Sequence, residues 1–189
     1  MKIKTKNMTI CAMFCALIVI GAFIKIDIPL PLYTMHFTLQ WLFVMMAAFL
    51  LGSKIGCLSV FTYVCLGLLG LPVFAAGGGI GYIFRPGFGF LLGFVLAAFI
   101  MGLVVEKMKN YKLSTLIISS SVGLFVYYLI GAIYFYLIKN LYVGEEVSFL
   151  VIVVDYCLIT VLPDFILCVF ASILCVKIKP RLDKVNQSI

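Results

Sequence analysis

Charged residues are scarce in this chain of 189 residues. Asp, Glu, Lys and Arg make up 11% of the sequence, whereas hydrophobic residues make up 65% and the mean hydropathy is +1.26. Soluble globular domains carry about 25% charged residues. The composition therefore excludes an ordinary soluble domain and indicates an integral membrane protein.

Motifs of common enzymes are missing as well. The sequence has no GxxxxGK[ST] loop for ATP, no HExxH metalloprotease motif and no nucleophile with a base at a recognisable spacing. Its seven cysteines form no CxxC pair, and they form no cluster with histidine at metal-ligand spacing. We therefore expect no metal, no cofactor and no catalytic residue, and the chain cannot drive transport by hydrolysing ATP itself.

Long apolar stretches fill most of the chain. A helix that crosses a bilayer needs about 20 apolar residues, and six stretches approach that length. They lie near residues 8–26, 37–52, 55–71, 88–105, 113–138 and 150–176. The sequence thus predicts an all-α membrane protein of six transmembrane helices, with residues 1–189 forming a single domain.

Basic residues orient these helices. All but three of the 14 lysines and arginines fall at the N-terminus, after the second and fourth stretches, and after the sixth; the exceptions are Lys25, Arg85 and Lys139. The positive-inside rule then places both termini in the cytoplasm of a multi-pass membrane protein. The net charge of +7 is spread over loops and tails, so it suits anionic lipid headgroups, whereas nucleic acid would need a contiguous basic face.

A glycine-rich loop, residues 70–89, follows the third stretch on the outer side. It is too rich in glycine for a stable span, yet its apolar side chains avoid water. We expect it to fold over the helix bundle and to cover a cavity that opens to the outside. A flexible hydrophobic linker is the alternative. The segment 27–36 after the first stretch is expected to be irregular.

Two aspartates lie inside the sixth stretch, where ionisable groups are costly unless they face a cavity or a partner. Their spacing places Asp155 and Asp164 on opposite faces of a helix. Asp155 is near the outer end and is expected to reach the interface. Asp164 is deeper and follows Pro163, whose missing N–H frees a backbone carbonyl. Asp164 is the stronger candidate for a binding residue.

Four other positions attract attention. Arg85, at the end of the glycine-rich loop, could hold a carboxylate or a carbonyl through paired hydrogen bonds, or it could anchor a lipid headgroup. Gln40 would place an amide inside the membrane. Trp41 is expected to anchor the outer interface, and His36 is expected to be structural, without proton chemistry.

Ala12 and Ala16 form a small-xxx-small pattern near the cytoplasmic end of the first stretch. Such a pattern lets another helix approach closely, although it is common in apolar helices.

Six runs of the sequence form a pattern typical of one family: Ile28-Pro29-Leu30-Pro31, Phe37-Thr38-Leu39-Gln40, Leu50-Leu51-Gly52, Gly70-Leu71-Pro72-Val73-Phe74-Ala75, Arg85-Pro86 and Gly87-Phe88-Gly89-Phe90-Leu91-Leu92-Gly93-Phe94. In these runs the chain resembles the BioY family, the biotin-binding S components of energy-coupling factor (ECF) transporters, which implies a place in the bacterial plasma membrane. The resemblance implies a vitamin pocket under the loop after the third helix. It also implies docking on a transmembrane coupling protein that two cytosolic ATPases drive.

The resemblance implies a set of residues that bind biotin: Gln40, Gly78, Gly79, Tyr82, Arg85 and Asp164. It also implies that Ala12 and Ala16 meet the coupling subunit. The chain departs from the family pattern at two positions, with His36 where many members have proline and Leu167 where a lysine often follows the aspartate. Lipoate or another small acyl vitamin is the nearest alternative ligand, and an integral membrane enzyme is the alternative from another class.

Overall fold

The computed structural model describes residues 5–30 and 32–187, of which most are helical. Three residues used in the predictions lie outside the described residues: Lys2 and Lys4, which are two of the basic residues at the N-terminus, and Pro31. The elements in chain order are α1 (Thr5–Phe23), β1 (Lys25–Ile28), β2 (Met35–Thr38), α2 (Gln40–Leu68), η1 (Ile80–Phe84), α3 (Phe88–Met108), α4 (Leu113–Leu137), η2 (Ile138–Val143), α5 (Phe149–Ile152), η3 (Val153–Leu158) and α6 (Ile159–Gln187).

Four helices are long and apolar enough to cross a membrane. They are Gln40–Leu68, Phe88–Met108, Leu113–Val143, in which η2 continues α4, and Phe149–Leu182, in which α5, η3 and α6 are continuous. α1 contributes a shorter apolar helix, Asn7–Phe23. The last helix extends to Gln187, well beyond the predicted end at residue 176.

The long helix α2 is broken at Gly52. Its backbone there has φ +82° and ψ 178°, a conformation that glycine adopts without strain. The chain turns back on itself at this point, since a Cβ on Gly56 would lie 2.8 Å from the carbonyl oxygen of Ala47. The gap between the predicted stretches 37–52 and 55–71 placed this turn at Ser53 and Lys54. The structure moves the break to the preceding glycine and caps the new helix start, because Glu106 Oε1 accepts a hydrogen bond of 2.7 Å from the Ser53 N–H.

A β-hairpin replaces the irregular backbone that was expected between the first two helices. β1 pairs with β2 antiparallel, with Lys25 opposite Thr38 and Ile28 opposite Met35. The first helix consequently ends at Phe23 rather than at residue 26, and the second begins at Gln40 rather than at residue 37. Pairing of the strands provides hydrogen-bond partners for the backbone N–H and C=O groups of this segment. An irregular loop beside an apolar bundle would leave these groups without partners.

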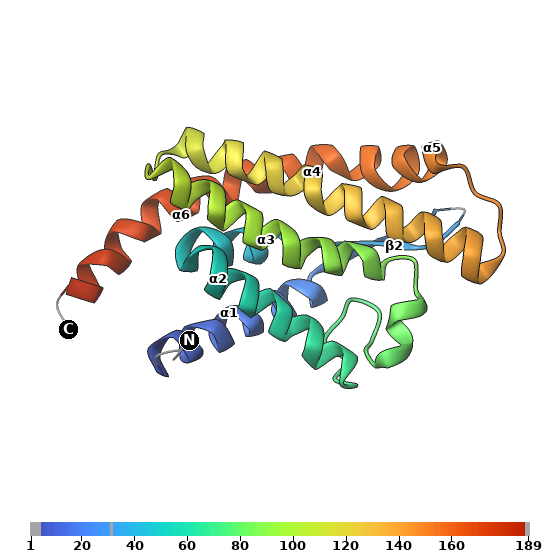
Figure 1. Cartoon of the computed structure of the whole chain (residues 1–189), viewed down its shortest axis with the longest axis horizontal. Helices are drawn as coiled ribbons and strands as arrows, with labels where there is room; N and C mark the ends of the chain where they lie inside the picture. Colours follow the sequence, from blue (N-terminus) through green and yellow to red (C-terminus); the bar gives the residue numbers. More distant parts are fainter. Residues whose placement is uncertain (1–4, 31, 188–189) are drawn as a thin grey trace.

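Figure 1 shows a bundle with two distinct ends. The start of α1, the break in α2, the connection between α3 and α4, and the end of α6 lie at one end. The β-hairpin, the glycine-rich loop and the connection between α4 and α5 lie at the other. Lys54 follows the break in α2 by two residues, and Lys107 and Lys112 flank the connection between α3 and α4, whereas Lys25 begins β1, Arg85 lies in the glycine-rich loop and Lys139 lies in η2.

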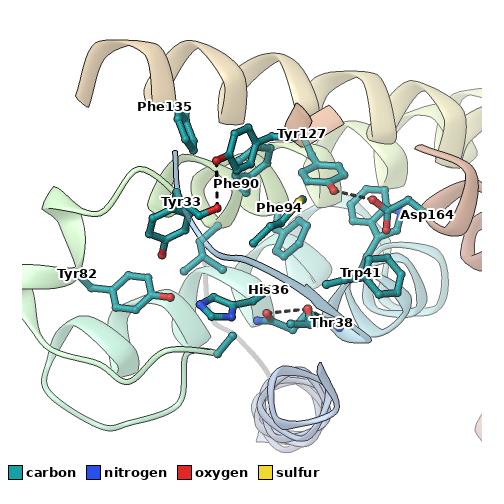
Figure 2. Close-up of a pocket in the computed structure, with 17 residues that line it drawn as sticks. Tyr33, His36, Thr38, Trp41, Tyr82, Phe90, Phe94, Tyr127, Phe135 and Asp164 are labelled. Carbon is teal, nitrogen blue, oxygen red and sulfur yellow. Dashed lines mark hydrogen bonds between the residues drawn. The ribbon is translucent and has the colours of Figure 1, made fainter. Parts of the chain in front are cut away.

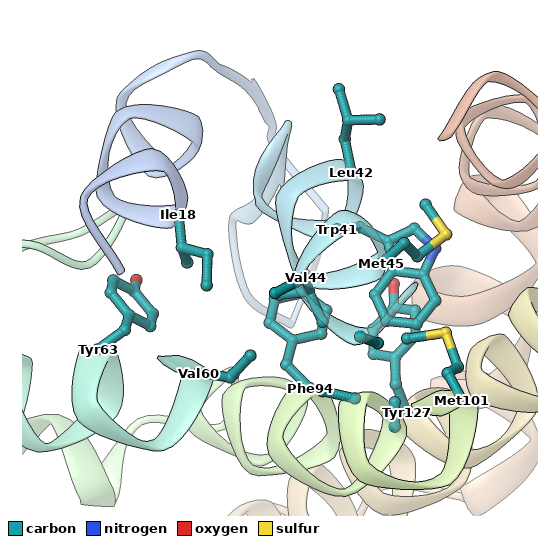
Figure 3. Packing of buried hydrophobic residues seen from close by; sticks show 14 of the residues in the cluster. Ile18, Trp41, Leu42, Val44, Met45, Val60, Tyr63, Phe94, Met101 and Tyr127 are labelled. Atoms are coloured by element: carbon teal, nitrogen blue, oxygen red, sulfur yellow. The ribbon is translucent and has the colours of Figure 1, made fainter. Parts of the chain in front are cut away.

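The core includes buried side chains of α1, α2, α3, α4 and α6, and α2 packs against both α1 and α3 within it. Figure 3 shows side chains from both arms of α2, among them Trp41, Val44 and Val60, packed with Ile18 of α1 and Met101 of α3. These five side chains are buried, whereas large apolar side chains such as those of Phe125 and Leu162 face outward. An apolar exterior around an apolar core is typical of a protein that lipid surrounds.

A candidate ligand site beneath the β-hairpin

A cavity lies at the hairpin end of the bundle, where six parts of the fold meet. Its volume is about 90 Å³. The hairpin and its connecting loop, the start of α2, the glycine-rich loop, α3, α4 and the last helix all contribute to its wall (Figure 2). The lining residues are Tyr33, Met35, His36, Phe37, Thr38, Gln40, Trp41, Ala75, Tyr82, Gly87, Phe90, Leu91, Phe94, Tyr127, Phe135, Tyr156 and Asp164.

Aromatic rings form the inner wall of the cavity. Trp41 stacks on Phe94 with ring centroids 5.5 Å apart and an interplanar angle of 22°. Tyr127 packs against both rings, with its centroid 4.9 Å from that of Trp41 and 5.0 Å from that of Phe94. Trp41 is 1% exposed, so the expectation that it anchors the outer interface is wrong. Its indole instead forms part of a rigid apolar surface suited to a flat ring system.

Asp164 provides the buried carboxylate of the cavity. It is 3% exposed, and its Oδ2 accepts hydrogen bonds from the hydroxyls of Tyr127, at 2.8 Å, and Tyr128, at 2.5 Å. The Tyr128 hydroxyl also lies 3.0 Å from Thr160 Oγ1. Among the described residues, no cation pairs with Asp164. Two phenols therefore stabilise the carboxylate, and since both use Oδ2, Oδ1 is left for a donor from a ligand.

Gln40 belongs to a chain of hydrogen bonds that runs from the hairpin to the glycine-rich loop. Its Oε1 accepts from Thr38 Oγ1 at 3.0 Å, and its Nε2 donates to the Tyr63 hydroxyl at 2.6 Å. The Tyr63 hydroxyl in turn donates to the Val73 carbonyl oxygen at 3.2 Å. Gln40 and Tyr63 are both buried. This chain fixes the amide of Gln40 in one orientation and ties the cavity wall to the base of the loop.

Tyr63→Phe should destabilise the protein by about 1 to 3 kcal/mol, because it leaves a buried amide N–H and a buried carbonyl oxygen without partners. Thermal unfolding of the detergent-purified variant measures the effect as a lower midpoint. Tyr142→Phe is the matched control, since Tyr142 is exposed, and its midpoint should stay near that of the unmodified protein. Equal midpoints for the two variants would show that the hydrogen-bond chain contributes no stability.

The glycine-rich loop folds over the end of α2. Gly79 has φ +98°, and its N–H donates to the Gly67 carbonyl oxygen at 2.7 Å. Phe74 is fully covered and packs on Tyr82, with ring centroids 4.6 Å apart. The Tyr134 hydroxyl donates to the Ile83 carbonyl oxygen and so ties the loop to α4. The loop is therefore an ordered cover at one side of the cavity.

The structure brings three of the six expected binding residues together. Gln40, Tyr82 and Asp164 line the cavity, whereas Gly78, Gly79 and Arg85 are not among its lining residues; the two glycines pack against the end of α2. The Arg85 guanidinium donates to the Ala76 carbonyl oxygen at 3.1 Å and lies 5.0 Å from the Tyr82 ring centroid. Arg85 thus contacts the loop itself and holds Tyr82 in place.

Ala12 and Ala16 lie far from the cavity, on the exposed face of α1. Because both side chains are exposed, neither of them packs inside the bundle. A surface of small side chains on an apolar helix is suited to close approach by another helix.

Sequence reasoning missed several residues that line the cavity or hold its polar groups. Tyr127 and Tyr128 were not singled out, although two adjacent hydroxyls inside an apolar stretch need buried partners and were a usable signal. His36 was expected to be structural, yet it lines the cavity and pairs with Asp27. Phe90 and Phe94 carried no signal, since aromatic residues are common in apolar stretches.

Comparison with known proteins points to one family. The sequence profile of the BioY family matches residues 1–184. A probable biotin transporter BioY from Lysinibacillus sphaericus is 40% identical over 164 residues, which cover 82% of this chain and 82% of the relative. A biotin transporter BioY from Thermotoga maritima is 43% identical over 133 residues, which cover 70% of this chain and 73% of the relative.

A solved structure has the same fold. The crystal structure of the S-component for biotin from an ECF-type ABC transporter superposes with a TM-score of 0.80 and covers 93% of this chain and 91% of its own. The two sequences are 26% identical.

Proposed function

The chain belongs to the BioY family, and from this premise we propose that it is the substrate-binding subunit of an ECF-type transporter that takes up biotin. The observation that carries the proposal is the cavity, which combines a stack of aromatic rings with a buried carboxylate whose Oδ1 has no partner among the described residues. The names of the relatives favour biotin over lipoate, and they favour transport over catalysis.

The chemistry of biotin is complementary to this cavity. Its ureido ring carries two N–H donors and a carbonyl, and Asp164 Oδ1 is placed to accept from an N–H. The fused rings are apolar enough to lie against Trp41, Phe94 and Tyr127. The tail ends in a carboxylate, which would be repelled by Asp164 and is expected to point toward the mouth. Exclusion of water by the glycine-rich loop would strengthen the few polar contacts.

We propose that the chain crosses the plasma membrane six times, with both termini in the cytoplasm. The six segments are α1, the two arms of α2 on either side of Gly52, α3, α4 with η2, and the continuous last helix. The first arm of α2, from Gln40 to the break, is only about 18 Å long at 1.5 Å per residue. The paired strand β2 continues it toward the outside with its backbone satisfied, and basic residues at the end opposite the hairpin support the cytoplasmic placement.

In this proposal, uptake of biotin against its concentration gradient requires partner subunits that supply energy. The sequence has no ATP-binding loop, so energy would come from two cytosolic ATPases through a transmembrane coupling subunit. The exposed alanines of α1 are the proposed contact with that subunit.

The detergent-purified protein should bind biotin with one-to-one stoichiometry and without turnover. Isothermal titration calorimetry measures binding, and chromatography of the recovered ligand tests whether it is unchanged. Lipoate is the matched control, because it has a similar acyl tail and no ureido group to donate to Asp164. Binding of lipoate in preference to biotin would reassign the ligand, and chemical conversion of the ligand would favour an enzyme.

A further inference from the structure

The mouth of the cavity carries a histidine that is held by a carboxylate. His36, on β2, lines the cavity, and its Nδ1 lies 2.6 Å from Asp27 Oδ1 on the facing strand β1. Asp27 Oδ2 lies 3.2 Å from Lys25 Nζ. The side chain of His36 is 18% exposed, compared with 48% for that of Asp27. The hairpin therefore presents one imidazole to the cavity and keeps its carboxylate on the solvent side.

The hydrogen bond to Asp27 fixes which nitrogen of His36 a ligand can meet. The hydrogen bond from His36, followed by the contact with Lys25, holds the pKa of Asp27 below its usual range. Asp27 thus stays ionised and accepts the hydrogen of Nδ1. Among the described residues, Nε2 has no hydrogen bond, so it is the ring nitrogen that can contact a bound molecule.

We propose that His36 binds the ionised carboxylate at the end of the ligand's tail, and that it does so in its protonated form with Nε2 as the donor. This inference rests on the proposed function, since it assumes a ligand with an acyl tail. It makes the hairpin a second recognition site at the mouth, remote from the ureido-binding carboxylate of Asp164.

The charges around the cavity support this orientation of the ligand. Lys25 and Asp27 pair with each other, so protonation of His36 adds one positive charge to the hairpin. Asp164, at the inner wall, would repel a carboxylate. Arg85 is the other cation near the mouth; its guanidinium contacts the Ala76 carbonyl oxygen and the Tyr82 ring and interacts with the Tyr33 hydroxyl. Among the residues that line the cavity, His36 is the one that can become cationic.

The other titratable groups that face His36 are phenols and the distant carboxylate. Tyr33, in the hairpin loop, packs edge-on against His36 with ring centroids 6.3 Å apart, and Tyr82 and Tyr156 line the same cavity. Burial raises the pKa of Tyr82 to about 12, with a smaller contribution from Tyr33, so this phenol stays neutral. Asp164 is the carboxylate at the inner wall of the same cavity, and its effect on binding is separable by choice of ligand.

The sign of the pH dependence follows from proton uptake. Imidazole side chains gain a proton between roughly pH 8 and 5, and a carboxylate ligand binds the protonated form better. Affinity for biotin should therefore rise as pH falls, by up to about tenfold per unit while the free protein is mostly unprotonated. Biotinamide, in which the tail carboxylate is a neutral amide, should show no such rise.

The test is calorimetric titration of the purified protein with biotin and with biotinamide from pH 5.5 to 8.5. We expect biotin to bind more tightly at low pH and to take up a proton on binding, whereas biotinamide should bind with constant affinity. His36→Asn keeps a donor for Asp27 but removes the titrating ring. It should abolish the pH dependence and lower biotin affinity at pH 5.5 by about tenfold or more, and it should lower the affinity for biotinamide much less.

Each result that differs from this expectation has one interpretation. A constant affinity for biotin, or an unchanged pH profile in His36→Asn, overturns the role of His36 while leaving the ligand assignment intact. The same pH dependence for both ligands assigns it to Asp164 and also overturns the role of His36. If neither ligand binds at any pH, the proposed function itself fails, and this inference fails with it.

Discussion

Asp164→Asn should weaken the binding of biotin by about 10- to 100-fold, the loss expected when a hydrogen bond of about 1.5 to 3 kcal/mol to a charged group is removed. The amide oxygen of the variant can still accept from Tyr127 and Tyr128, which fixes its NH₂ group toward the cavity. A donor would then face the ureido N–H of the ligand where the acceptor had been. Calorimetry of the purified variant measures the change in dissociation constant.

Asp155→Asn is the matched control, because it makes the same chemical change in the same continuous helix. Asp155 is half-buried, lies in η3 and makes no hydrogen bond or ion pair with the described residues. Its substitution should leave affinity within about twofold, the range of a surface change. Thermal unfolding should give similar midpoints for the two variants. Equal and small effects on binding would show that Asp164 has a structural role only.

The positions of the helices were largely predictable because they follow from hydropathy and from the breaks between apolar stretches. Apolar stretches located the helices, and the interruption at Ser53 and Lys54 indicated the turn that the structure places at Gly52. The β-hairpin was not predictable in the same way. Its strands have only four residues each, too few for a period-two pattern to stand out, and their pairing depends on how the segment enters the bundle.

The candidate site was predictable only where burial carries a large cost. A carboxylate inside an apolar stretch is expensive, so Asp164 could be identified from its position alone. Tyr128, Trp41 and Phe94 depend on contacts between helices far apart in the sequence, which local pattern does not encode. The surroundings of Arg85 were equally hidden, since it is the fold of the loop that brings the Ala76 carbonyl oxygen within 3.1 Å of its guanidinium.

Replacing Ala12 and Ala16 together with leucine should abolish most biotin uptake by the complete transporter while leaving ligand binding unchanged. The side chains lie on the exposed face of α1, whereas Phe14, Cys15 and Ile18 on the opposite face are buried. Leucine therefore fits without disturbing the bundle, but it holds a partner helix away from the backbone. Uptake of radiolabelled biotin in cells that express all subunits, beside calorimetry of the purified variant, separates the two effects.

Ser114→Leu is the matched control, because Ser114 is a small exposed residue on α4 at the same end of the bundle. It adds similar apolar bulk to the exterior without touching α1, so its uptake should equal that of the unmodified protein at equal expression. Co-purification with the coupling subunit locates any defect, since the alanine variant should lose the partner and Ser114→Leu should retain it. If the alanine variant is well expressed, keeps its partner and transports normally, the coupling subunit contacts a different face of the protein.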